Sequence, residues 1–193
     1  MPAGVENPPG PGVLHVSLRD GTPAMLWPLS PDDGRGLRQR YEELSPDSRY
    51  DRFLSTVRTL SPGLLDRLVR DVDGVDHVAL VLTAYPADGH ERTVGIGRMV
   101  RYADQPSRAD VAVTVEEAWR GRGVASALLA ALVEHRPRGV EALDTQVSVG
   151  NRASQAMLAR LGPTTVKQAG SGILDVHVDL PEPTASPTAS PTA

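Results

Sequence analysis

Residues 111–135, VAVTVEEAWRGRGVASALLAALVEH, decide the fold of this chain. Val111, Val113 and Val115 alternate with smaller or polar residues, which is the period-two pattern of a β-strand. From Val124 onward the apolar residues change to helical spacing, so we expect a helix to begin there. The segment RGRGVA, residues 120–125, is therefore a tight connection from a strand into a helix.

This connection is suited to binding an anion. Gly121 and Gly123 have no Cβ, so the backbone can turn sharply and direct several consecutive N–H groups at one ligand. The helix adds the positive end of its dipole and its unpaired first-turn donors. Arg120 and Arg122 add positive charge, although a purely structural role for either arginine stays open. The segment predicts a phosphate-binding turn.

Two widespread phosphate motifs do not fit this turn. A P-loop requires a Lys followed by Ser or Thr after the second glycine, where this chain has Val124 and Ala125. A dinucleotide fingerprint over Gly121, Gly123 and Ser126 has the wrong third residue, and no acidic strand end follows at the expected distance. A different phosphate-containing ligand is indicated.

The spacing of Arg120, Gly123 and Ala125 resembles the acyl-CoA binding signature of the GNAT acetyltransferases. The preceding RADVAVTVEEAW, residues 108–119, resembles the fourth strand of that family. The later VEALDTQVSVGNRASQAMLARLGP, residues 140–163, resembles its fifth strand and the helix after it. The motif is thus supported on both sides by the segments that the family places there.

The resemblance extends through most of the chain and implies a fold. Residues 44–84 resemble the first helices and second strand of GNAT domains in bacterial protein lysine acetyltransferases. The implied fold is α+β (mixed α/β), with a central, mostly antiparallel twisted sheet flanked by helices and with splayed fourth and fifth strands. We expect a GNAT domain at 13–181, a disordered Pro/Gly-rich N-terminus at 1–12 and a disordered Pro/Thr/Ala/Ser tail at 182–193.

Hydrophobic patterning predicts the other elements of the sheet. Strands are expected at 24–30, 77–85, 92–103, 164–170 and 173–181, and a helix is expected to begin within 31–45. Asp88 and Gly89 suit a hairpin turn between the second and third of these strands. Ser171 and Gly172 separate the last two, which form another hairpin.

Composition excludes several classes of protein. The 193 residues suit one core, and 4% aromatic content predicts that the core is mainly Leu, Val and Ala. The absence of cysteine excludes disulfides and a cysteine nucleophile. The net charge of −4 without a basic face predicts no nucleic-acid partner, and five isolated histidines predict no metal site. Without a long apolar run or a signal-like start, we expect a cytoplasmic protein with no membrane contact.

The resemblance implies an acetyl-CoA-dependent N-acetyltransferase in which an amine attacks the thioester directly. Its implied cofactor-binding residues are Val113, Thr114 and Val115 for the pantetheine arm, and Arg120, Gly121, Arg122, Gly123, Val124 and Ala125 for the pyrophosphate. Asn151 and Ser154 match positions that bind pantetheine and phosphate groups in the family. Asn151 is equally suited to be a helix N-cap.

An amine acceptor requires a base. Deprotonating a lysine of pKa near 10.4 at neutral pH costs roughly 4.6 kcal/mol. The family usually places a Glu on its fourth strand for this purpose, and the matching residue is Asp110, one methylene shorter. Strand alternation makes Glu116 a second catalytic candidate, and solvent is a third. The tyrosine acid of many members is replaced by Met157 or Leu158, so water is expected to protonate the thiolate.

The acceptor implied by the N-terminal half is a protein lysine, such as one on an acyl-CoA synthetase. A small-molecule amine is the alternative, because a fold analogy does not fix the substrate. A catalytically weak acyl-CoA binding or sensing domain is the second alternative, motivated by Asp110 and the missing tyrosine. The sequence leaves the oligomeric state open.

Overall fold

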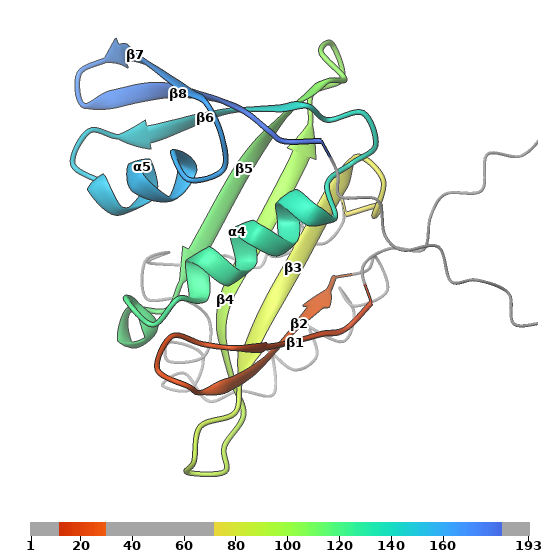
Figure 1. Cartoon of the computed structure of the whole chain (residues 1–193), viewed down its shortest axis with the longest axis vertical. Coiled ribbons are helices and arrows are strands. Elements are labelled where there is room, and N and C mark those ends of the chain that lie inside the picture. Colours follow the sequence, from red (N-terminus) through yellow and green to blue (C-terminus); the bar gives the residue numbers. More distant parts are fainter. Residues whose placement is uncertain (1–11, 30–71, 183–193) are drawn as a thin grey trace, which may run out of the picture.

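The computed structural model describes residues 12–29 and 72–182. These residues form an eight-stranded mixed sheet with the strand order β1-β2-β3-β4-β5-β6-β8-β7 and two α-helices (Figure 1). The expected α+β fold with a mostly antiparallel sheet is confirmed. The termini predicted to be disordered, 1–12 and 182–193, lie outside the described residues except for residues 12 and 182. The helices predicted between 30 and 71 also lie outside them.

The elements follow the predicted order. The strands are β1 (Leu14–Ser17), β2 (Pro23–Pro28), β3 (His77–Ala84), β4 (Arg92–Arg101), β5 (Arg108–Val115), β6 (Ala142–Ser148), β7 (Thr164–Gly170) and β8 (Ile173–Asp179). The helices are the short 3₁₀ helix η1 (Glu117–Trp119), α4 (Val124–Glu134) and α5 (Arg152–Leu158). The family's fourth and fifth strands therefore correspond to β5 and β6.

One strand was missing from the prediction. β1 pairs antiparallel with β2, from Leu14 opposite Leu26 to Ser17 opposite Pro23. The strand is only four residues long and follows a Pro/Gly-rich segment, so its pattern is weak. The signal that identifies it is Asp20 followed by Gly21, since Asp-Gly is a strong hairpin sequence.

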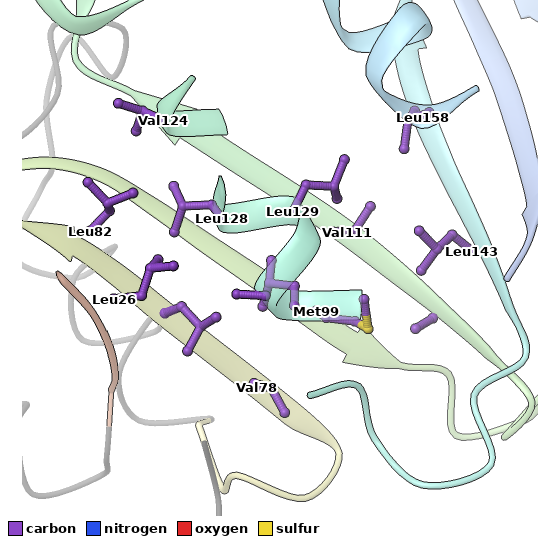
Figure 2. Close-up of a cluster of buried hydrophobic side chains, with 14 of the residues drawn as sticks. Leu26, Val78, Leu82, Met99, Val111, Val124, Leu128, Leu129, Leu143 and Leu158 are labelled. Carbon is purple, nitrogen blue, oxygen red and sulfur yellow. The ribbon is translucent and has the colours of Figure 1, made fainter. Parts of the chain in front are cut away.

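The main core lies between α4 and the sheet. Figure 2 shows Val124, Leu128 and Leu129 of α4 directed at apolar side chains of the strands, including Leu82 and Met99. Almost all buried residues of this cluster are Leu, Val or Ala, which confirms the prediction of an aliphatic core. Burying such side chains is worth about 1.5–3 kcal/mol each, so this layer stabilises the part of the sheet that borders the cleft described below.

β5 and β6 separate soon after they meet. They are parallel neighbours joined at only two positions, Arg108 with Ala142 and Ala109 with Leu143. Figure 1 shows the two strands diverging from this closed end, with β6 carried away together with β7, β8 and α5. The predicted splay of these strands is confirmed. Within the described ranges, no helix is long and apolar enough to span a membrane.

Candidate active site

A long cleft of about 1920 Å³ follows the gap between β5 and β6 and reaches the N-terminus of α4. Its volume exceeds the roughly 300–1,000 Å³ typical of pockets for drug-sized ligands, which suits an extended ligand. α4 and α5 border it and meet where the Ser126 hydroxyl donates to the Met157 sulfur at 3.7 Å. The cleft thus has a closed end, where the strands pair, and an open end at the glycine turn.

Main-chain groups of β5 face the cleft at alternate residues. The Tyr102 N–H donates to the Arg108 oxygen, and the Glu116 N–H donates to the Val94 oxygen, so even-numbered residues of this stretch bond to β4. By alternation, the N–H groups of Val113 and Val115 point toward the gap. The Thr114 N–H points toward β4. Two of the three predicted pantetheine donors therefore face the cleft, and Thr114 lines it with other atoms.

The glycine turn has the predicted form. Gly121 and Gly123 have φ values of 77° and 94°, in the left-handed region that favours glycine. Gly123 is the N-cap of α4 and supplies no side-chain cap, so the first-turn N–H groups of the helix remain available to a ligand. Arg120, Gly121, Gly123, Val124 and Ala125 all line the cleft. The turn therefore presents unpaired donors and the positive end of a helix dipole.

Arg122 contacts Asp20 and Trp119 instead of lining the cleft. It makes an ion pair with Asp20 at 3.3 Å, and its guanidinium lies 4.7 Å from the centre of the Trp119 ring. It is not among the residues that line the cleft. Arg19, which sequence reasoning missed, does line the cleft, and its N–H donates to the Arg122 oxygen at 2.8 Å. The β1–β2 turn thus braces the glycine turn.

Asn151 and Ser154 lie together at the start of α5. The Asn151 side chain accepts a hydrogen bond from the Ser154 N–H at 3.1 Å, so Asn151 is the N-cap of this helix. Both residues also line the cleft. The capping role is confirmed, and the predicted contact of each with the ligand stays a prediction.

The two predicted carboxylates have different positions. Asp110 is half-buried in β5 and lines the closed end of the cleft. Within residues 12–29 and 72–182, its carboxylate makes no hydrogen bond and no ion pair. Its charge is felt by Tyr102, whose pKa is raised by burial and then by Asp110 and neighbouring carboxylates. Glu116 lies beyond the end of β5 and is not among the lining residues.

A polar network that sequence reasoning missed lies at the same closed end. Asp144 of β6 accepts from Arg108 at 2.8 Å and pairs with the Nδ1 atom of His177 at 2.6 Å. The Nε2 atom of His177 lies 3.2 Å from Asp179. The hydrogen bond to Asp144 raises the pKa of His177 against the effect of burial. Burial opposes ionisation of Asp144, but the bonds from His177 and Arg108 outweigh it and lower its pKa.

No metal is indicated by this arrangement. Among the residues that the structure describes, no three His, Asp or Glu side chains converge as metal ligands would. The cleft presents main-chain donors of β5, the Asp110 carboxylate and the glycine turn.

Comparison with known proteins agrees with this geometry. The model of the acetyltransferase (GNAT) family matches residues 38–162. An acetyltransferase from Pseudomonas aeruginosa is 33% identical over 147 residues, covering 76% of this chain and 77% of that protein. Acetyltransferase Pat from Mycolicibacterium smegmatis is 31% identical over 169 residues, covering 87% of this chain and 49% of that protein. The chain thus spans about half the length of this second relative.

A solved structure of a GNAT domain also matches this chain. The GNAT domain of S. lividans PAT superposes with a TM-score of 0.64 at 31% identity, covering 87% of this chain and 97% of that domain. The chain belongs to the GNAT family and is an acetyltransferase. The splayed β5–β6 pair and the glycine turn at the start of α4 agree with this assignment.

Proposed function

We propose that this chain transfers the acetyl group of acetyl-CoA to the side-chain amine of a protein lysine, by direct attack of the amine on the thioester. The use of acetyl-CoA is supported by the family and by a long cleft that runs from Asp110 to the glycine turn at the start of α4. The lysine acceptor is supported by the similarity to acetyltransferase Pat and to the GNAT domain of PAT. The resemblance of residues 44–84 to protein lysine acetyltransferases points the same way.

The observation that carries the mechanism is the carboxylate of Asp110 at the closed end of the cleft. A base must be able to take a proton, and a carboxylate already bound to an arginine and a histidine, as Asp144 is, is poorly placed to do so. Asp110 has no such partner among the described residues and is half-buried. In the proposed reaction it takes a proton from the acceptor ammonium, directly or through one water.

The remaining steps follow from the geometry of β5. The neutral amine attacks the thioester carbon, and the carbonyl oxygen becomes an oxyanion. An N–H group directed into the gap, such as that of Val113, stabilises this charge. The carbon–sulfur bond then breaks, the nitrogen gives its second proton to water, and the leaving thiolate takes a proton from water. The products are an acetylated amine and CoA.

The donor is held at the opposite end of the cleft in this proposal. The pyrophosphate lies on the amides of the glycine turn and the first turn of α4, beside Arg120. The pantetheine arm pairs with main-chain groups of Val113 and Val115. Asn151 and Ser154 border it from α5.

The experiment that tests the function is the release of CoA from acetyl-CoA by the full chain. Acceptors are acetyl-CoA synthetase, lysine peptides and a panel of small amines. Asp110→Asn tests the base, and Gly123→Glu places a side chain and a negative charge in the phosphate turn at a φ of 94°. Because Gly123→Glu strains the backbone, Arg120→Ala serves as a second donor-site variant.

Each outcome assigns the acceptor or rejects the transferase. Release that depends on a protein lysine, disappears in Gly123→Glu and falls about 10²-fold or more in Asp110→Asn supports the proposal. Release with small amines alone replaces the protein acceptor by a small-molecule amine. Binding of acetyl-CoA without release for any acceptor would favour a sensing domain.

A further inference from the structure

The closed end of the cleft is held by side chains where the main-chain ladder stops. β5 and β6 pair last at Ala109 and Leu143. One residue further along β6, the Asp144 carboxylate binds Arg108, and the Asp144 main-chain oxygen accepts from the Tyr102 hydroxyl at 3.0 Å. These contacts tie β6 to β5 and to the residue after β4 without extending the ladder.

A second side chain of β6 occupies a ladder position of β5. The Thr145 hydroxyl donates to the Val111 oxygen at 3.2 Å, so it occupies the acceptor that the next strand pair would use. Strands with open N–H and C=O groups tend to pair with any neighbouring edge. At this point side-chain bonds therefore take the place of the main-chain ladder, and Asp144 takes part in the bonds to Arg108, Tyr102 and His177.

Both oxygens of Asp144 are used. The Oδ2 atom accepts from Arg108 of β5, and the Oδ1 atom lies 2.6 Å from the Nδ1 atom of His177 in β8. Asp144 and His177 are direct partners in the β6–β8 register, so their side chains share one face of the sheet. The carboxylate thus connects three strands at the end of the cleft that also holds Asp110.

We propose that Asp144 is a positioning residue for acetyl transfer: held between Arg108 and His177, it fixes the separation of β5 and β6 and so places the thioester opposite Asp110. The inference rests on the proposed transfer of an acyl group in this cleft and is independent of which amine accepts it. A displacement of about 1 Å at a reacting centre can lower a rate by roughly 10². The expected effect is therefore on kcat.

The charge of His177 is part of this arrangement. Both ring nitrogens face carboxylates, Asp144 on β6 and Asp179 on its own strand, so only the imidazolium can donate to both. Asp175 also lies on this face of β8. β7 presents Thr165 opposite His177 and Lys167 opposite Asp175.

The other charged groups at this end are Arg108 and Asp110. Arg108 of β5 reaches His177 through the shared carboxylate, and the charges of Asp110 and Asp144 both act on Tyr102. Loss of the His177 proton leaves one ring N–H for two carboxylates, so one of the two hydrogen bonds is lost and the pairing with Asp144 loses its ionic part. We therefore expect kcat of the wild-type protein to fall on the alkaline side as His177 loses its proton.

The test compares Asp144→Asn and His177→Gln with Asp175→Asn as a matched control. Asp175 lies on the same face, but its side chain accepts from the neutral Gln146 amide at 2.9 Å. The full chain is assayed for kcat with the best amine of the panel and, separately, with water as the acceptor. The dissociation constant of CoA is followed by the fluorescence of Trp119, which lines the cleft.

The expected result is a fall in kcat of about 10²-fold for both variants, with CoA affinity within about threefold of wild type. The kcat of the double variant should be no lower than that of either single variant. The fall of kcat on the alkaline side should be absent from His177→Gln. The kcat of the Asp175→Asn control should stay within about twofold of wild type. Amide exchange at Ala109 and Leu143 should become faster in both variants. A kcat within twofold of wild type, or equal losses in kcat, CoA affinity and melting temperature, would overturn the inference.

The design separates this inference from the proposed function. If lysine peptides are not acetylated but a small amine or water accepts the acetyl group, the acceptor assignment fails while the comparison of kcat values stands. If Asp110→Asn leaves kcat unchanged, Asp110 is not the base; the control of the strand separation by Asp144 is then supported only if His177→Gln, which keeps the Asp144 carboxylate, lowers kcat as much as Asp144→Asn does.

Discussion

At the scale of single residues, two of the aspartates that line the cleft have opposite surroundings. Asp144 is bound by Arg108 and His177, whereas Asp110 makes no hydrogen bond or ion pair with the described residues. The two lie on neighbouring strands at one end of one cleft. Their environments therefore indicate different roles. We infer that Asp144 positions the strands and that Asp110 exchanges a proton in the proposed reaction.

Substitutions at Asp110 test how long the side chain of the proposed base has to be. Asp110→Glu keeps a carboxylate and restores the side chain that the family usually has at this position, so we expect kcat within about threefold of wild type. Asp110→Asn removes the base and should lower kcat by about 10²- to 10⁴-fold. The measurement is the steady-state rate at saturating acetyl-CoA. Equal losses in both variants would indicate that the carboxylate has only a structural role.

Two neighbouring arginines should respond differently to truncation. Arg120 lines the cleft, so Arg120→Ala should weaken CoA binding by about tenfold through the loss of a phosphate contact. Arg122 is engaged by Asp20 and Trp119, so Arg122→Ala should change CoA affinity by less than about threefold and should lower stability instead. Calorimetric titration with CoA measures the difference. Arg138→Ala, at an exposed residue after α4, is the control, and a larger binding loss in Arg122→Ala than in Arg120→Ala would reverse the assignment.

At the scale of elements, α4 is seated on two glycines of β4. A Cβ atom at Gly95 would lie 2.7 Å from Val124 Cγ1 and 2.9 Å from Leu128 Cδ1. At Gly97 it would lie 2.8 Å from Leu132 Cδ1. These approaches bring the N-terminus of α4, and with it the glycine turn, close to the sheet. The position of the proposed phosphate site thus depends on the packing beneath the helix.

Adding one methyl group tests this packing. Gly95→Ala should reduce the free energy of unfolding by about 1–3 kcal/mol, because the stiff side chain of Val124 must move. Gly150→Ala is the matched control, since a Cβ there meets only Ser148 Oγ at 3.8 Å and needs no positive φ. Urea unfolding of both variants measures the difference. If Gly95→Ala proved as stable as the control, α4 would not be packed as closely as described.

At the scale of the whole molecule, the cleft divides the sheet into two halves. β1 to β5 with α4 form one half, and β6 to β8 with α5 form the other (Figure 1). The halves are joined beside the cleft by three features. These are two main-chain pairs of β5 and β6, the contact of Ser126 with Met157 and the network around Asp144. The stability of this junction should therefore depend on pH.

The direction of that dependence follows from the two pKa shifts. The pKa of His177 is raised by its bond to Asp144, so its contribution is complete below about pH 6.5 and is lost as pH rises through the folded-state value. The pKa of Asp144 is lowered by His177 and Arg108 despite burial, so its contribution is present above about pH 3.9 and is lost as pH falls through the folded-state value. The network stabilises most between these limits.

Melting temperatures across pH check this expectation. The difference between wild type and His177→Gln should be largest near pH 5 to 6 and should shrink as pH rises beyond the folded-state pKa of His177. His90→Gln, at an exposed residue of the β3–β4 connection, should show no such pattern. A difference that grew with rising pH would mean that neutral His177 is the stabilising form.

The amino-acid sequence by itself determined the local features of this protein. The alternation of β5, the two glycines and the start of α4 at Val124 follow from backbone preferences over a few residues, and so does the N-cap at Asn151. The spacing of Arg120, Gly123 and Ala125, together with the segments on either side of it, indicated the family. Such features need no knowledge of distant segments, because periodicity and positive φ act within one or two turns of chain.

Only the tertiary structure decided which polar groups meet. Asp144 and His177 are 33 residues apart, Arg108 and Asp144 are 36 apart, and Arg122 and Asp20 are 102 apart. These pairs depend on the order and register of the strands, and a shift of one residue would turn each side chain to the other face. The physical reason is that local propensity shapes each strand, whereas burial of the shared core sets the alignment between strands and thereby assigns the polar partners at the closed end of the cleft.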